Sequence, residues 1–147
     1  MLTAVNPSTG ETVRSVEADT DAQIETKLAA AQTAYRTWRD TGFAERAALL
    51  NKVAKLMRDE VERLAPIMTE EMGKPIKEAR GEVNKAAWRA EHYAEHAEDY
   101  LRRHVIASDA SLSYVQHLPI GPVLGILPWN APFYAGLGFR PLRRRDL

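Results

Sequence analysis

The run of residues best suited to chemistry lies near the C-terminal end, at Pro128-Trp129-Asn130-Ala131-Pro132. It directly follows a continuous apolar stretch, residues 123–127, which is typical of a strand covered on both faces. Loops at the carboxyl ends of such strands are where α/β folds bind ligands. The side-chain amide of Asn130 could therefore donate a hydrogen bond to a developing oxyanion, while the prolines and Trp129 hold it stiffly. The alternative is a rigid turn in which the Asn130 side chain bonds local backbone.

Two other groups of side chains could do chemistry, and both have a simpler explanation. His92 and His96 are four residues apart, so they share one face of a helix and could ligate zinc. No third ligand accompanies them, and the residues between them do not give the metalloprotease pattern. We interpret them as surface histidines and predict no metal site. The many carboxylates between residues 91 and 99 are interpreted in the same way, as a solvated helix face.

The composition removes several classes of function. The chain of 147 residues has no cysteine, so it has no disulfide, no thiolate metal site and no thiol nucleophile. Its 20 basic and 20 acidic residues balance, which argues against a nucleic-acid binder. It has no apolar run long enough to cross a membrane and no secretory signal at its start. We therefore expect a soluble cytoplasmic protein of ordinary domain size, with no nucleic-acid or membrane partner.

The first elements that must position these residues are a β-hairpin and a helix. The β-prone runs 2–5 and 12–16 flank a turn rich in Asn, Pro and Gly. Thr20 and Gln23 fit a capping box, so a helix should begin there and end near Gly42. The apolar residues that follow at helical spacing form one stripe of this helix. They are Ile24, Leu28, Ala31, Tyr35 and Trp38, and we assign Tyr35, Trp38 and Trp88 to core or helix packing.

Three further helices and two further strands are predicted. The helical region 43–72 should break near residues 58–62, because Pro66 is tolerated only in the first turn of a new helix. A long helix over residues 75–102 carries an alanine-rich stripe, which permits close approach of a neighbouring helix. Residues 111–118 alternate and are β-prone, and residues 123–127 form the buried strand described above.

The order and spacing of these motifs resemble the aldehyde dehydrogenase superfamily. The matching residues are Asn6-Pro7-Ser8-Thr9-Gly10-Glu11, Trp38, Glu71-Met72-Gly73-Lys74-Pro75, Glu78-Ala79 and the segment from Pro119 to Asn130. Within that family, the Glu71–Pro75 run and Tyr93-Ala94-Glu95-His96 are most similar to NAD(P)-dependent succinate-semialdehyde dehydrogenases. The resemblance covers about residues 4–134.

The resemblance implies an α/β fold that is the N-terminal portion of an aldehyde dehydrogenase, and incomplete. Residues 1–134 would be a partial cofactor-binding domain with a β-hairpin, several helices and the start of a Rossmann-like nucleotide-binding sheet. Residues 111–118 would form part of the oligomerisation ribbon, so the complete protein would be a homo-oligomer.

The resemblance also implies a reaction. Family members oxidise an aldehyde, here plausibly succinate semialdehyde, to the acid with NAD or NADP. A cysteine attacks the aldehyde, and the side-chain amide of Asn130 would serve catalysis by binding the oxyanion. Leu127, Pro128 and Trp129 would line the cofactor cleft. Because this chain has no cysteine, we expect it to be inactive alone and its cofactor binding to be doubtful.

The sequence departs from the family pattern at its end. From about Gly136 the match is lost, and residues 135–147 form an arginine-rich tail in which Gly138 and Pro141 would interrupt a helix. Such a tail could bind nucleic acid or an acidic membrane. We prefer an out-of-frame ending, from a frameshifted or truncated gene. A non-catalytic helical interaction or oligomerisation module is the alternative to a dehydrogenase fragment.

Overall fold

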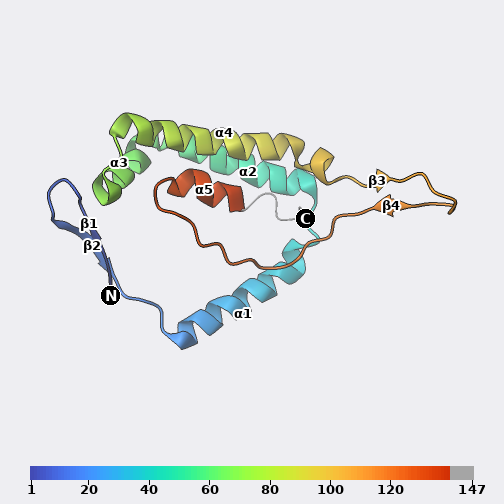
Figure 1. Ribbon diagram of the computed structural model, residues 1–147, viewed down its shortest axis with the longest axis horizontal. Helices are drawn as coiled ribbons and strands as arrows, with labels where there is room; N and C mark the ends of the chain where they lie inside the picture. Colours follow the sequence, from blue (N-terminus) through green and yellow to red (C-terminus); the bar gives the residue numbers. More distant parts are fainter. Residues whose placement is uncertain (140–147) are drawn as a thin grey trace.

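A computed structural model describes residues 1–139 of the chain. Its body consists of four helices: α2 (Phe43–Asp59), α3 (Val61–Met72), α4 (Ile76–Leu101) and α5 (Pro132–Phe139). In Figure 1, α4 lies along α2, with α3 at one end of the pair and α5 beside it. Every buried apolar residue whose burial is described comes from these four helices, so the core lies between them. They are Ala54, Met57, Ala65, Met68, Ala79, Val83, Ala86, Ala87, Ala90 and Leu137.

The alanine stripe of α4 explains why these helices pack closely. Ala79, Ala86, Ala87 and Ala90 are fully buried, and Val83 is the bulkiest side chain buried among them. Small side chains let neighbouring backbones approach, so α2 and α3 both rest on this one face. The prediction that the stripe packs against a neighbouring helix is confirmed.

The helix boundaries also follow the sequence signals. The capping box at Thr20 is formed, with the Gln23 side chain returning a bond to the Thr20 backbone, and α1 spans Asp21–Trp38. Glu60 separates α2 from α3, inside the predicted break. Pro66 is nevertheless the sixth residue of α3, beyond its first turn. The helix therefore does without one interior hydrogen bond, because proline has no N–H to donate.

Two antiparallel hairpins flank the helices. The strands β1 (Leu2–Val5) and β2 (Thr12–Val16) pair as predicted. At the other end, β3 (His104–Val105) pairs with β4 (Tyr114–Val115) in an arm that projects from the helices (Figure 1). The β-prone segment 111–118 thus contributes only two paired residues. Its partner β3 was not predicted, because a two-residue strand carries no periodicity.

The turn of the first hairpin meets the C-terminal end of α3 at Gly73. This glycine has φ of +74°, and a Cβ added to it would lie 2.9 Å from Cγ of Pro7. We expect Gly73→Ala to lower the free energy of unfolding by about 1–2 kcal/mol, because an L-residue is strained in the left-handed region and Pro7 must also move. Urea unfolding measures this. Gly81→Ala is the control and should not destabilise the chain, since nothing lies within 4 Å of its Cβ position.

The predicted strand over residues 123–127 is wrong. The chain is extended there but pairs with no other strand, and among residues 1–139 the sheets are β1–β2 and β3–β4 alone. Leu124 and Ile126 are 84% and 89% exposed. A strand is defined by hydrogen bonds to a neighbour, and the described chain offers none beside this segment. A hydrogen bond to α1 holds the stretch before it: Tyr35 donates its hydroxyl to the carbonyl of Pro119 at 3.0 Å.

The assignment of Trp38 and Trp88 to the core is also wrong. Both side chains are about half exposed, and α1 contributes no buried residue. Trp38 instead lies under the guanidinium of Arg46, 5.1 Å from its ring centroid, and Trp88 lies beside His92 on α4. Helical spacing identifies the apolar stripe but not whether another element covers it.

A bidentate ion pair links α2 to α4 and gives a pH-dependent prediction. Arg58 donates from Nε and Nη2 to the carboxylate of Glu91, at 3.0 and 2.6 Å. These bonds lower the pKa of Glu91 from its ordinary value of 4.5. A carboxyl whose pKa is lower in the folded state stabilises the fold above its unfolded pKa and loses that contribution as pH falls.

We therefore expect Glu91→Gln to cost less than about 1 kcal/mol at neutral pH, because the pair is partly exposed. The difference from the unaltered chain should shrink as pH falls below 4.5. Urea unfolding across this pH range measures it, and a difference that grows in acid would contradict the assignment.

The C-terminal part of the described chain corrects another expectation. Helix α5 passes through Gly138 to Phe139, so this glycine does not interrupt it. Pro141 and the arginines of the tail lie outside the described residues. Within residues 1–139 no helix is both long enough and apolar enough to span a bilayer.

Candidate functional site

The candidate oxyanion donor, Asn130, lies between the extended segment and the first turn of α5. It is exposed, and its side-chain amide forms no hydrogen bond with any residue among 1–139. The structure therefore does not contain the alternative, a turn in which the Asn130 side chain bonds the neighbouring backbone. An exposed carboxamide without an internal partner has an N–H group free to donate to a bound oxygen.

The backbone of Asn130, in contrast, is held. The ammonium group of Lys74 donates to the carbonyl oxygen of Asn130 at 2.7 Å. Lys74 follows the left-handed Gly73 at the end of α3, and its side chain is only 14% exposed. The same ammonium group forms an ion pair with Glu82, which projects from α4. A residue 56 positions earlier in the chain thus fixes the backbone beside the candidate donor.

Glu82 is the one buried charged residue among those described, with 8% of its surface exposed. Its Oε1 accepts the backbone N–H groups of Phe133 at 3.0 Å and Tyr134 at 3.3 Å. These are the second and third residues of α5, whose N–H groups have no partner within the helix. Ala131, just before the helix, has no side chain that could cap it. The carboxylate of α4 therefore caps α5, where the helix dipole also favours negative charge.

A second set of contacts ties the same turn of α5 to α4. Arg89 donates from Nη1 to the carbonyl oxygen of Tyr134 at 3.1 Å. Its guanidinium and the ammonium of Lys85 both lie over the Tyr134 ring, 4.4 and 4.8 Å from the centroid. The cations beside the ring and the carboxylate beneath the turn fix α5 on α4 from two sides.

The predicted cofactor-binding residues Leu127, Pro128 and Trp129 lie immediately before Asn130 on the surface. Trp129 is 77% exposed, and Leu127 and Pro128 are exposed as well. They present apolar surface next to an unpaired amide, a combination that suits a flat ring with a polar edge. Lys74 and Glu82 were missed at the sequence level. Lys74 lay in a family motif without an assigned role, and Glu82 resembled any carboxylate of a solvated helix face.

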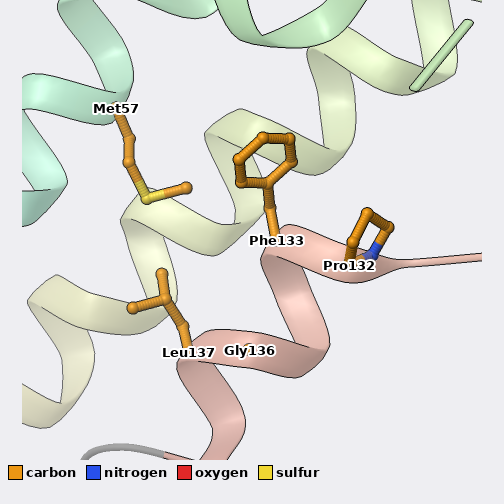
Figure 2. A pocket seen from close by; sticks show the side chains of 5 residues that line it. All are labelled: Met57, Pro132, Phe133, Gly136 and Leu137. Carbon is orange, nitrogen blue, oxygen red and sulfur yellow. The ribbon is translucent and has the colours of Figure 1, made fainter. Parts of the chain in front are cut away.

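An open pocket of about 390 Å³ lies on the core side of α5. Figure 2 shows Phe133 and Leu137 projecting from α5 towards Met57 of α2. Pro132 and Gly136 complete its lining; none of these side chains can transfer a proton, and a lone Met57 thioether does not make a metal site. The pocket is therefore a packing feature, separate from Asn130.

The histidines of α4 do not form a metal site in the described chain. The rings of His92 and His96 lie 4.6 Å apart, and Nε2 of His92 shares a hydrogen bond of 3.0 Å with the Tyr100 hydroxyl. Within residues 1–139, no three His, Cys, Asp or Glu side chains are grouped so that they could hold a metal ion.

Comparison with known proteins extends the sequence resemblance over the whole described chain. The model of the aldehyde dehydrogenase family matches residues 1–138, slightly more than the 4–134 expected from the motifs. A probable succinate-semialdehyde dehydrogenase [NADP(+)] from Synechocystis sp. is 38% identical over 133 residues. A succinate-semialdehyde dehydrogenase [NADP(+)] from Deinococcus radiodurans is 39% identical over 135 residues. The matches span 90% and 92% of this chain but 29% and 28% of those proteins.

Solved structures give the same result for the fold. The succinic semialdehyde dehydrogenase of Streptococcus pyogenes, solved with NADP+, superposes with a TM-score of 0.87 at 32% identity, over 92% of this chain and 30% of that one. The NADP complex of a glyceraldehyde-3-phosphate dehydrogenase from Methanocaldococcus jannaschii gives 0.86 at 26% identity, over 93% and 30%. The α/β arrangement is thus that of the N-terminal portion of such enzymes, and the chain belongs to the aldehyde dehydrogenase family.

Proposed function

We propose that this segment provides the oxyanion donor and part of the cofactor cleft of an enzyme that oxidises an aldehyde to a carboxylic acid with NAD or NADP. The observation that carries the proposal is the exposed, unpaired amide of Asn130 on a backbone fixed by Lys74, in a segment that matches the family model. The similarity to succinate-semialdehyde dehydrogenases supports succinate semialdehyde as the substrate.

The role of Asn130 follows from charge development. When a nucleophile attacks an aldehyde carbonyl, negative charge accumulates on the carbonyl oxygen. A donor that is already oriented stabilises that charge without reorganising, which is where enzymes gain much of their rate. The Asn130 amide meets this requirement because its backbone is held by Lys74 while its Nδ2–H groups have no partner among residues 1–139.

The apolar surface of residues 127–129 fits one face of a nicotinamide ring, and the dinucleotide would supply the hydride acceptor. Leu127 and Trp129 would exclude water from that face, since both present apolar surface to solvent in the described chain. Three residues of an extended segment do not enclose a ring. We therefore do not expect the 147-residue polypeptide alone to bind NAD or NADP measurably.

The β3–β4 arm supports a role in self-association. Val105, Tyr114 and Val115 are exposed on a two-stranded ribbon that projects from the helices. An unpaired ribbon edge is a template for pairing with another chain. We propose that a protein containing this segment forms a homo-oligomer through the arm.

The 147-residue polypeptide by itself should be inactive. Its sequence has no cysteine, and in this family mechanism the thiolate is the covalent catalyst, for which Asn130 cannot substitute. Purified material is expected to give no aldehyde-dependent NAD(P)H absorbance. Turnover that persists after the host's own dehydrogenases are removed would contradict this.

A chimera tests the proposed function directly. Residues 1–138 would replace the matching N-terminal part of the Streptococcus pyogenes enzyme, which supplies everything else. We expect succinate-semialdehyde oxidation by the chimera, measured as NADPH formation. A chimera that folds and binds NADP+ but fails to oxidise the aldehyde would contradict the proposal.

A further inference from the structure

We propose that Lys74 and Glu82 are positioning residues for Asn130, and we call the two side chains the Lys74–Glu82 clamp. This inference rests on the proposed function, because it concerns how the oxyanion donor is held. The clamp joins three parts of the chain: the α3–α4 junction, the N-terminal part of α4 and the start of α5.

The clamp holds the backbone on both sides of Asn130. The Lys74 ammonium binds the carbonyl of Asn130 itself, and Glu82 binds the N–H groups of Phe133 and Tyr134. Together they fix both ends of a stretch of only five residues. Because Pro132 lies between them and restricts its own φ and the residue before it, little freedom is left for the peptide that carries the Asn130 side chain.

The segment that precedes Asn130 does not fix the position of this residue. Residues 123–127 form no ladder with another strand in the described chain, and the nearest upstream tether is Tyr35 at Pro119. An extended segment without pairing leaves the following loop free to shift. The position of Asn130 in this chain is therefore set by contacts from the α3–α4 junction and from α4.

The burial of the clamp is a second reason to assign it a positioning role. Both side chains are largely buried, at 14% and 6% exposure, and their ammonium and carboxylate groups bond to each other. Buried ion pairs contribute little net stability compared with apolar side chains of the same size. The clamp's polar groups point at backbone atoms of one loop, so they specify where that loop lies.

The test compares loop order with global stability in the full 147-residue chain. The double substitution Lys74→Met with Glu82→Met keeps the volume and removes both charges, so the unfolding midpoint should stay close to that of the unaltered chain. Amide hydrogen exchange at Phe133 and Tyr134, followed by NMR, should accelerate about tenfold or more, because both N–H groups lose a charged acceptor. Exchange at Ala86 and Ala87 should not change.

Two further variants complete the design. Lys74→Arg keeps the positive charge and should retain slow exchange at Phe133 and Tyr134. If Lys74 acted only by filling space, exchange at these two residues would not depend on that charge. The matched control removes an exposed pair, Arg80 with Glu62, by Arg80→Met and Glu62→Met, and should leave exchange in α5 unchanged.

Three results would overturn the inference. One is unchanged exchange at Phe133 and Tyr134 in the double variant. Another is an equal acceleration throughout α4, which indicates general loss of packing. The third is failure of Lys74→Arg to retain slow exchange. None of these readouts uses activity. A result that contradicts the positioning role is therefore distinguishable from an inactive chimera, which would contradict the proposed function alone.

Discussion

Replacing Asn130 by Ala in an active chimera is expected to lower kcat by about 10²–10³-fold, the usual effect of removing one oxyanion donor. The KM for the aldehyde should change much less, because the ground-state carbonyl carries little charge. The fold should be unaffected, since the Asn130 side chain is exposed and unpaired. Steady-state kinetics with succinate semialdehyde and NADP+ measures both constants, and circular dichroism verifies that the chimera is folded.

Asn84→Ala is the matched control for this substitution. Asn84 is an exposed asparagine on α4 whose Nδ2 donates to the carbonyl of Arg80 in the same helix, at 3.0 Å. The same change of side chain there should leave kcat within about twofold, because surface substitutions away from special features have small effects. Equal losses from both substitutions, or no loss from Asn130→Ala, would remove Asn130 from the proposed reaction.

Replacing Glu82 alone by Met is expected to lower the free energy of unfolding by about 3 kcal/mol, the largest stability effect among the predicted substitutions. The substitution leaves the Lys74 ammonium largely buried without its counter-ion. It also leaves the N–H groups of Phe133 and Tyr134 without an acceptor. This expected loss in the free energy of unfolding is at the low end for a broken buried ion pair. Lys74 keeps its hydrogen bond to the Asn130 carbonyl, and its side chain is partly exposed to solvent.

The same substitution at the exposed Glu98 of α4 is the control, and it should change stability by less than about 0.5 kcal/mol. Adding Lys74→Met to Glu82→Met should restore most of the lost stability, since no unpaired charge then remains. Urea unfolding of the unaltered chain, Lys74→Met, Glu82→Met and the double variant forms a double-mutant cycle. Additive losses from Lys74→Met and Glu82→Met would mean that the two side chains act independently.

Much of the secondary structure could be predicted because its signals are local. The capping box at Thr20 and the break around Glu60 each act within one turn of the chain. The alanine stripe of α4 is likewise recognisable from the helical spacing of its residues, and it identified the face on which α2 and α3 pack. The candidate donor Asn130 was found in the same way, from a short run of distinctive residues.

The sequence by itself therefore determined helices α1 to α4, the first hairpin, the packing face of α4 and the run that carries Asn130, whereas α5 was not predicted. Only the tertiary structure decided that residues 123–127 have no pairing partner in the described part of the chain, that Trp88 lies exposed, and that Lys74 and Glu82 meet at the Asn130 loop. The physical reason is the separation along the sequence of the residues that interact. Caps and periodicity depend on neighbours a few residues away, whereas strand pairing, burial and a bond between residues 74 and 130 depend on how distant segments come together.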